Sequence, residues 1–208
     1  MKLKGCIRHG LIVVMLALGL SIAPMSAHAL AIIDFGTGLG DDGGVLTWLG
    51  GNNSKGEDVP IGALRVSGAP LNNGTYLVTD GELDYNTTLN TVSISGVIAG
   101  LGLGNMTLLS GSFTSFTTEY GVNAYLNFRG VGPDEKAPAL LNALGMDTLT
   151  PFGFYGFTLS GQPITGTTFY ATSTDFRNTA VPEPATMLLL GSGLIGLAGF
   201  ARRRFRKN

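Results

Sequence analysis

Two apolar segments, each beside a group of basic residues, lie near the two ends of this 208-residue chain. The first covers residues 11–22 and follows three basic residues, and the second covers residues 185–201 and precedes a basic cluster. Basic residues beside an apolar segment stay on the cytoplasmic side of a membrane. We therefore expect the residues between the two segments, 30–180, to be exported and to form one globular domain.

The N-terminal segment has the parts of a secretory signal peptide. Its basic part contains Lys2, Lys4 and Arg8. Its apolar run of 12 residues is too short to cross a bilayer. Ala27 and Ala29 form a small-x-small cleavage site. The sequence therefore predicts a signal peptide over residues 1–29, export through the Sec translocon, and cleavage by signal peptidase before Leu30.

The C-terminal tail, residues 181–208, has three parts. Pro182, Glu183 and Pro184 open it, and the prolines hold this backbone extended. The uncharged run over residues 185–201 would extend for roughly 26 Å as a helix, close to the thickness of a bilayer core. The basic part, residues 202–207, begins with Arg202, Arg203 and Arg204. We expect a recognition handle, a transmembrane helix and a basic membrane stop.

The tail resembles the PEP-CTERM sorting signal of Gram-negative bacteria, which membrane enzymes called exosortases recognise. Residues 181–186 read Val-Pro-Glu-Pro-Ala-Thr and are followed by the apolar span and an arginine-rich ending. The resemblance implies an inner-membrane precursor that an exosortase-like enzyme processes near the motif, with the product at the cell surface or outside the cell. It covers only the tail. The alternative is a surface protein that keeps the tail as a permanent membrane anchor.

Charge and composition exclude several functions for the exported domain. Residues 30–180 contain five basic and 13 acidic side chains, which gives a net charge of −8. Nucleic acid binding requires clustered Lys and Arg that neutralise phosphates, so we expect none. Cysteine and histidine occur only within residues 1–29. Disulfides, Cys or His catalysis and His-based zinc sites are therefore excluded from residues 30–180.

The domain has the sequence pattern of a β protein. Short runs of alternating apolar and polar residues predict strands over residues 92–98, 113–118, 124–128, 154–159 and 167–172. Residues 80–81 and 161–163 carry turn chemistry. Residues 138–145 predict one short helix that ends at Gly145. Short strands at this spacing favour an antiparallel, jelly-roll-like β-sandwich.

One acidic run could bind a cation. Asp80, Glu82 and Asp84 would lie on one face of a strand, and three carboxylates attract a hard ion such as calcium. The alternative is the solvated face of an edge strand, whose charges prevent edge-to-edge pairing. The sequence predicts no cofactor.

These observations predict an exported β-sandwich with a structural or binding role in the extracellular matrix. The resemblance of the tail associates such proteins with exopolysaccharide, which becomes a possible partner of residues 30–180. We expect no catalytic residue. The alternative is a carbohydrate-active enzyme that works with two carboxylates, the one acid–base chemistry left by the absence of Cys and His.

We predict that replacing Glu183 by Gln slows processing of the tail and leaves membrane insertion unchanged. The substitution keeps the shape of the side chain and removes the charge that a basic group of the processing enzyme would contact. Acidic residues contribute little to membrane orientation, so topology should be normal. Membrane fractionation and intact mass should show full-length protein accumulating. Equal processing of both forms would contradict the role of Glu183 in recognition.

Overall fold

A computed structural model of the chain describes residues 30–37, 43–121, 125–181, 191 and 193. The predicted signal peptide, the Pro182 to Pro184 handle, the transmembrane span and the basic stop lie outside the described residues, apart from two isolated positions in the span. Within the part of the chain that is described, no helix is long and apolar enough to cross a membrane. That part is all-β with one short α-helix, as the sequence predicts.

Twelve strands and two short helices follow one another along the described chain. The first half contains β1 (Ile32–Gly36), β2 (Gly43–Gly50), β3 (Asn53–Pro60), β4 (Ala63–Ser67), β5 (Gly74–Leu77), β6 (Thr79–Asn86) and β7 (Thr91–Ile98). The second half contains the 3₁₀ turn η1 (Ala99–Leu101), β8 (Leu103–Gly111), β9 (Ser115–Tyr120), β10 (Leu126–Lys136), α2 (Pro138–Ala143), β11 (Phe152–Thr165) and β12 (Thr168–Ala180).

All twelve strands belong to one antiparallel sheet that closes on itself. Eight of them form a ring in the order β11-β10-β8-β7-β6-β3-β2-β12, and pairing of β11 with β12 completes the ring. Strands β1, β4 and β5 extend the sheet outward from β12, and β9 pairs with β10. The architecture is therefore a closed eight-stranded barrel with extra strands, and not clearly the predicted jelly-roll-like sandwich.

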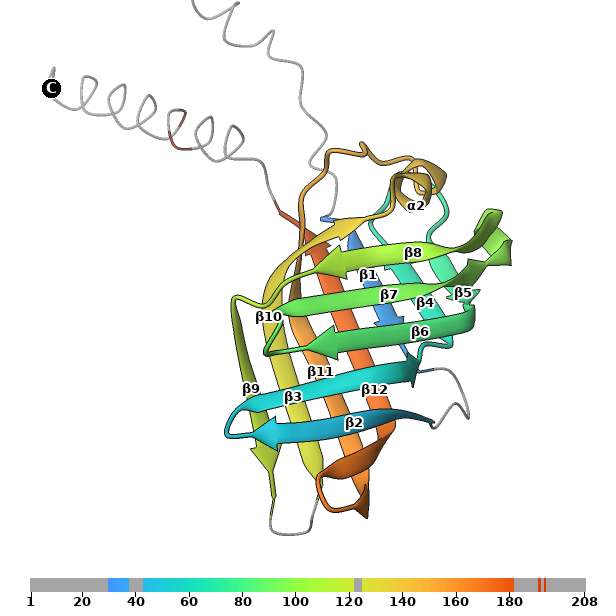
Figure 1. Cartoon of the computed structure of the whole chain (residues 1–208). Coiled ribbons are helices and arrows are strands. Elements are labelled where there is room, and N and C mark those ends of the chain that lie inside the picture. The colour runs from blue at the N-terminus through green and yellow to red at the C-terminus, as the bar shows by residue number, and fades with distance from the viewer. Residues whose placement is uncertain (1–29, 38–42, 122–124, 182–190, 192, 194–208) are drawn as a thin grey trace, which may run out of the picture.

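The barrel is flattened into two layers whose strands cross at a steep angle (Figure 1). The front layer contains β2, β3, β6, β7 and β8, and the back layer contains β1, β4 and β9 to β12. Strand β12 joins the layers at one corner, because residues 168–171 pair with β2 and residues 175–179 pair with β1. A strand that changes partners in this way closes orthogonally packed layers into a barrel.

Local irregularities explain why periodicity predicted shorter strands. The turns expected at residues 161–163 and 80–81 do not form. The first position instead carries a pair of register shifts inside β11, and the second carries a register shift inside β6. Such bulges bend a strand without ending it. Strands β11 and β12, with 14 and 13 residues, are therefore long enough to serve both layers.

The interior of the barrel is filled by apolar side chains from both layers. Six of the largest are fully buried phenylalanines: Phe35, Phe128, Phe154, Phe157, Phe169 and Phe176. The ring centroids of Phe157 and Phe176 lie 4.9 Å apart, and those of Phe128 and Phe157 also lie 4.9 Å apart. Because the domain has no cysteine, this core and the sheet hydrogen bonds stabilise it without disulfides.

Helix α2 lies at the barrel end where β1 begins and β12 ends (Figure 1). It confirms the predicted helix, and Gly145 follows it with the positive φ of 69° that favours glycine after a helix. At the same end, the Ala180 amide donates a hydrogen bond of 3.1 Å to the Ala31 carbonyl. The domain thus starts and finishes at one rim.

One ion pair is buried inside this end of the barrel. The ammonium of Lys136 contacts the carboxylate of Asp134, and both side chains are fully buried. Lys136 also donates to Asn178 Oδ1 at 3.0 Å and lies 4.6 Å from the ring centroid of Phe152. Burial lowers the pKa of Lys136 to about 8, and the charge of Asp134 opposes this change. The pair therefore depends on mutual contact to stay charged.

Buried hydroxyl groups form hydrogen bonds between the two layers of the barrel, where β9 meets the front layer. Strand β8 pairs with only three residues of β10, and β9 pairs with the lower part of β10 instead. The Tyr85 hydroxyl donates to Ser54 Oγ at 3.1 Å, and Ser54 Oγ lies 3.0 Å from Thr118 Oγ1. Thr118 Oγ1 in turn donates to the Asn52 carbonyl at 2.7 Å. These bonds connect β9 to the front layer.

We predict that Ser54→Ala lowers the free energy of unfolding by about 1–3 kcal/mol, because it leaves the buried Tyr85 hydroxyl without its acceptor. Ser160→Ala is the matched control, since it removes an exposed hydroxyl that bonds to Asn127. Urea denaturation of both variants measures the effect. Equal denaturation midpoints for the two variants would show that the buried hydroxyl hydrogen bonds do not stabilise the closed barrel.

Candidate functional site

The acidic run proposed as a cation site is spread along β6. Glu82 and Asp84 are exposed, and Asp80 lies in a bulge with a φ of 49°. Asp84 Oδ1 accepts a hydrogen bond of 2.9 Å from the Asp58 amide. Among the described residues, no three His, Cys, Asp or Glu side chains gather where they could hold a metal ion.

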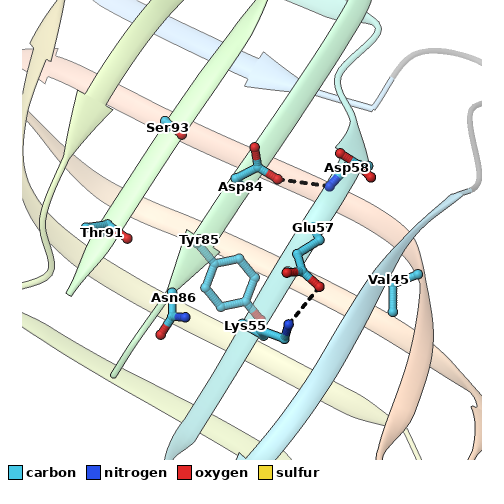
Figure 2. Close-up of a pocket in the computed structure, with 10 residues that line it drawn as sticks. Val45, Lys55, Glu57, Asp58, Asp84, Tyr85, Asn86, Thr91 and Ser93 are labelled. Atoms are coloured by element: carbon cyan, nitrogen blue, oxygen red, sulfur yellow. Dashed lines mark hydrogen bonds and ion pairs between the residues drawn. The ribbon is translucent and has the colours of Figure 1, made fainter. Parts of the chain in front are cut away.

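A hollow of about 530 Å³ lies on the outer face of the front layer (Figure 2). Its one basic side chain, Lys55, forms a 2.8 Å ion pair with Glu57. The Asp84 carboxylate accepts its hydrogen bond from the backbone amide of Asp58. Figure 2 shows these bonds running between the lining residues themselves. Of the charged groups of this hollow, Lys55 and Glu57 neutralise each other, and Asp84 accepts a backbone hydrogen bond.

The outer face of the back layer, turned away from the viewer in Figure 1, carries all three arginines of residues 30–180. Arg65 lies on β4, Arg177 on β12 and Arg129 on β10, and each is exposed. Their positions follow from strand alternation, because each has a buried neighbour on at least one side that points into the barrel. Asp34 of β1 is paired in register with both Arg65 and Arg177.

Three hollows adjoin one another along this face and form a groove across the strands. The central hollow, about 420 Å³, shares Asp34, Arg65 and Arg177 with a neighbour of about 160 Å³. It shares Tyr155 with another neighbour of about 370 Å³, which Arg129 also lines. We call this continuous surface the arginine groove. Its titratable side chains are Asp34, Arg65, Arg129, Tyr155, Asp175 and Arg177.

Two carboxyl groups lie together in the arginine groove. Asp34 and Asp175 line the same hollow, and the pKa of Asp34 is raised to about 6. The largest cause is burial, followed by the hydrogen-bonding influence and the charge of Asp175. Arg177 and Arg65 oppose the increase, and Arg177 Nη2 lies 3.7 Å from Asp34 Oδ2. Near pH 6 the Asp34 carboxyl group is therefore about half protonated.

The groove is positive although the domain is acidic. Three guanidinium groups face two carboxyl groups, and the pKa of one of them, Asp34, is raised to about 6. The pKa of Arg177 is raised first by the charge of Asp175, then by Asp34 and Tyr155, so this guanidinium stays charged. Elsewhere, Lys55 and Lys136 are paired with acidic side chains. The groove is thus the one surface of the described domain where positive charge exceeds negative charge.

Sequence reasoning missed this site. It noted the five basic residues of the domain only as a count, since they are far apart along the chain. A signal was nevertheless present: Asp34 lies between Ile33 and Phe35, and Arg65 lies between Leu64 and Val66. A single charge between two apolar residues of a strand predicts an outward side chain over a buried layer. Only the strand order could show that these outward charges meet.

Comparison with known families identifies the tail and leaves the barrel unassigned. Residues 180–206 match the family model of the PEP-CTERM protein-sorting motif, which confirms the resemblance stated above. The motif implies an exported protein of the cell envelope that an exosortase, a membrane enzyme, processes. No curated protein and no solved structure matches this chain. The matched segment begins at Ala180, the last residue of β12.

The raised pKa of Asp34 predicts a pH-dependent stability. In the unfolded chain this carboxyl group loses its proton near pH 4, whereas in the barrel it keeps the proton up to about pH 6. The folded state therefore binds more protons between these values, and stability falls as pH rises through this window. We predict that Asp34→Asn removes this slope and raises the free energy of unfolding at pH 7.5 by up to about 3 kcal/mol.

Urea denaturation at pH 4.5, 6.0 and 7.5 measures this effect. Glu82→Gln removes an exposed carboxyl group of the front layer and should leave the slope as it is in the unmodified protein. An unchanged slope in Asp34→Asn would contradict the raised pKa of Asp34.

Proposed function

We propose that this exported protein acts in the extracellular matrix by binding an acidic polysaccharide along the arginine groove. One observation carries the proposal. All three arginines of a domain with a net charge of −8 line the same groove, together with an exposed tyrosine. Concentrated positive charge on an otherwise acidic protein favours an anionic ligand and repels other surfaces.

The chemistry of the groove suits the carboxylate groups of uronic acids. A guanidinium group donates two parallel hydrogen bonds to a carboxylate, which a lysine ammonium cannot do. Arg65 and Arg177 lie two strand spacings apart, about 10 Å, on either side of β1. They could therefore contact separate carboxylates of one chain.

Tyr155 adds an apolar contact at the middle of the groove. It lines both of the larger hollows and is 49% exposed. An exposed tyrosine ring supplies a flat surface on which a sugar ring stacks. Because the groove crosses the strands from β10 to β4, a polymer could lie along it without entering the barrel.

The sorting tail places this binding domain at the cell envelope. We propose that the signal peptide and the tail first hold the precursor in the inner membrane, with residues 30–180 outside the cytoplasm. Processing near Pro182 to Pro184 then gives a surface or extracellular form. A protein that meets polymer outside the cell needs no cofactor and no catalytic residue.

The alternative, a carboxylate-dependent enzyme, is less well supported by the groove. The carboxyl groups of glycosidases stand about 5–5.5 Å apart in retaining enzymes and about 6.5–9.5 Å apart in inverting enzymes. Asp34 and Asp175 line one hollow of the groove, where burial and the charge of Asp175 raise the pKa of Asp34. The three guanidinium groups of the groove suit an anionic ligand, so the groove favours binding.

We predict that the exported protein binds alginate, a polymer of uronic acids, and not neutral dextran. Arg177→Gln should weaken alginate binding about five-fold, because an exposed charged contact contributes about 1 kcal/mol. Binding should weaken at high salt and strengthen as the pH falls below about 6, where Asp34 gains a proton. Isothermal titration calorimetry measures each of these changes.

Lys55→Gln is the matched control, since it changes the net charge equally on the opposite layer. Equal loss in both variants would mean that net charge alone attracts the polymer. Binding of dextran as tight as that of alginate, or unchanged alginate binding by Arg177→Gln, would contradict the proposed function.

A further inference from the structure

We infer that the barrel rim at the root of the tail is a docking surface for the membrane enzyme that processes the tail. The inference rests on the processing that the sorting motif implies. It goes further by assigning to the folded domain a surface that this enzyme contacts, so that recognition extends beyond the motif itself.

The tail leaves the barrel without a spacer. Ala180 is the last residue of β12, and its amide bonds to the Ala31 carbonyl. The Val181 amide then donates to the Pro151 carbonyl at 2.8 Å. The next residue in the sequence is Pro182, where the recognition handle begins. Both bonds hold the backbone on the rim up to the residue before the handle.

This geometry brings the enzyme against the rim. The three residues from Pro182 to Pro184 span at most about 10 Å even when fully extended. Any protein whose cleft encloses these residues therefore lies within about 10 Å of Val181, whose amide bonds to the Pro151 carbonyl. Contact between the folded rim and the enzyme follows from the length of the connection.

The rim has a surface suited to such a contact. The largest hollow among those described, about 660 Å³, lies here and is lined by Pro151 and by residues of α2 and β11. Its lining includes Pro138, Leu141 and Leu149, so much of it is apolar. Leu149 is 85% exposed, the most exposed large apolar side chain described. Leu30 and Val181, which are 45% and 46% exposed, lie at the same rim and extend this apolar surface. A patch of several exposed apolar side chains is typical of a protein contact site.

The rim is also ordered, which favours recognition by a preformed surface. The Leu149 amide donates to Asp147 Oδ1 at 2.9 Å, and the Thr150 amide donates to the Asp147 carbonyl at 3.0 Å. Below them, the buried pair of Lys136 and Asp134 borders the same hollow. A surface held in place by its own hydrogen bonds loses little conformational entropy when a partner binds.

The test is the rate at which full-length precursor is processed in its host, followed by intact mass over time. Leu149→Glu should slow processing about five-fold or more. Leu89→Glu is the matched control, because Leu89 is 71% exposed on the turn between β6 and β7. It should be processed at the normal rate. Thermal unfolding of the isolated products should show that both variants fold, and Leu149→Ser replaces Leu149→Glu if the latter does not.

A flexible spacer separates rim contact from motif recognition. About ten Gly and Ser residues placed between Val181 and Pro182 separate the handle from the rim by roughly 17 Å on average. The spacer alone should slow processing, and Leu149→Glu should then add no further effect. Normal processing of Leu149→Glu, equal slowing by Leu89→Glu, or independent effects of spacer and substitution would each overturn the inference.

Two other results can be distinguished from failure of the rim contact alone. If the unmodified protein keeps Arg202 to Arg204 at steady state, processing of the tail fails as a whole and the rim inference fails with it. If the purified protein is a dimer that Leu149→Glu dissociates while processing stays normal, a second copy of the chain covers the rim instead. The second result would overturn the docking of the enzyme and leave the sorting motif intact.

Discussion

Strand β12 holds the structure together because it pairs with three other strands. It lies beside β11 over most of its length, beside β2 over residues 168–171, and beside β1 over residues 175–179. Its inward side chains, Phe169 and Phe176, belong to the core, and its outward Asp175 and Arg177 belong to the arginine groove. Its last residue carries the sorting tail. Closure of the barrel, the binding surface and the root of the tail therefore depend on one strand.

Charge in this domain follows the layers of the barrel. Lys136 is buried with Asp134, and Lys55 is paired with Glu57 on the front layer. The three arginines lie on the back layer, where they outnumber Asp34 and Asp175 and the pKa of Asp34 is raised to about 6. An acidic domain thereby keeps one positive surface. The acidic remainder supports solubility outside the cell and limits contact with polyanions to the groove.

The tail, the class of fold and the helix after Pro138 could be predicted from the sequence, since each depends on local patterns of charge, alternation and capping. Closure of the barrel could not. Bulges near Gly161 and Gly81 look like turns in the sequence, although the strands continue through them. The arginine groove was also hidden, because Asp34, Arg65 and Arg177 meet only through the pairing of β1 with both β4 and β12. Local patterns contain no information on such partners.

Hydrogen exchange of the β12 amides tests the central claim most directly, namely that one strand closes the barrel and supports both functional surfaces. If β12 joins the two layers, the amides bonded to β2 and those bonded to β1 should exchange only through global unfolding, with the same free energy of opening. A sandwich of separable sheets predicts a different result. In that case, residues 168–171 would exchange much faster than residues 175–179, and the closed barrel would be contradicted.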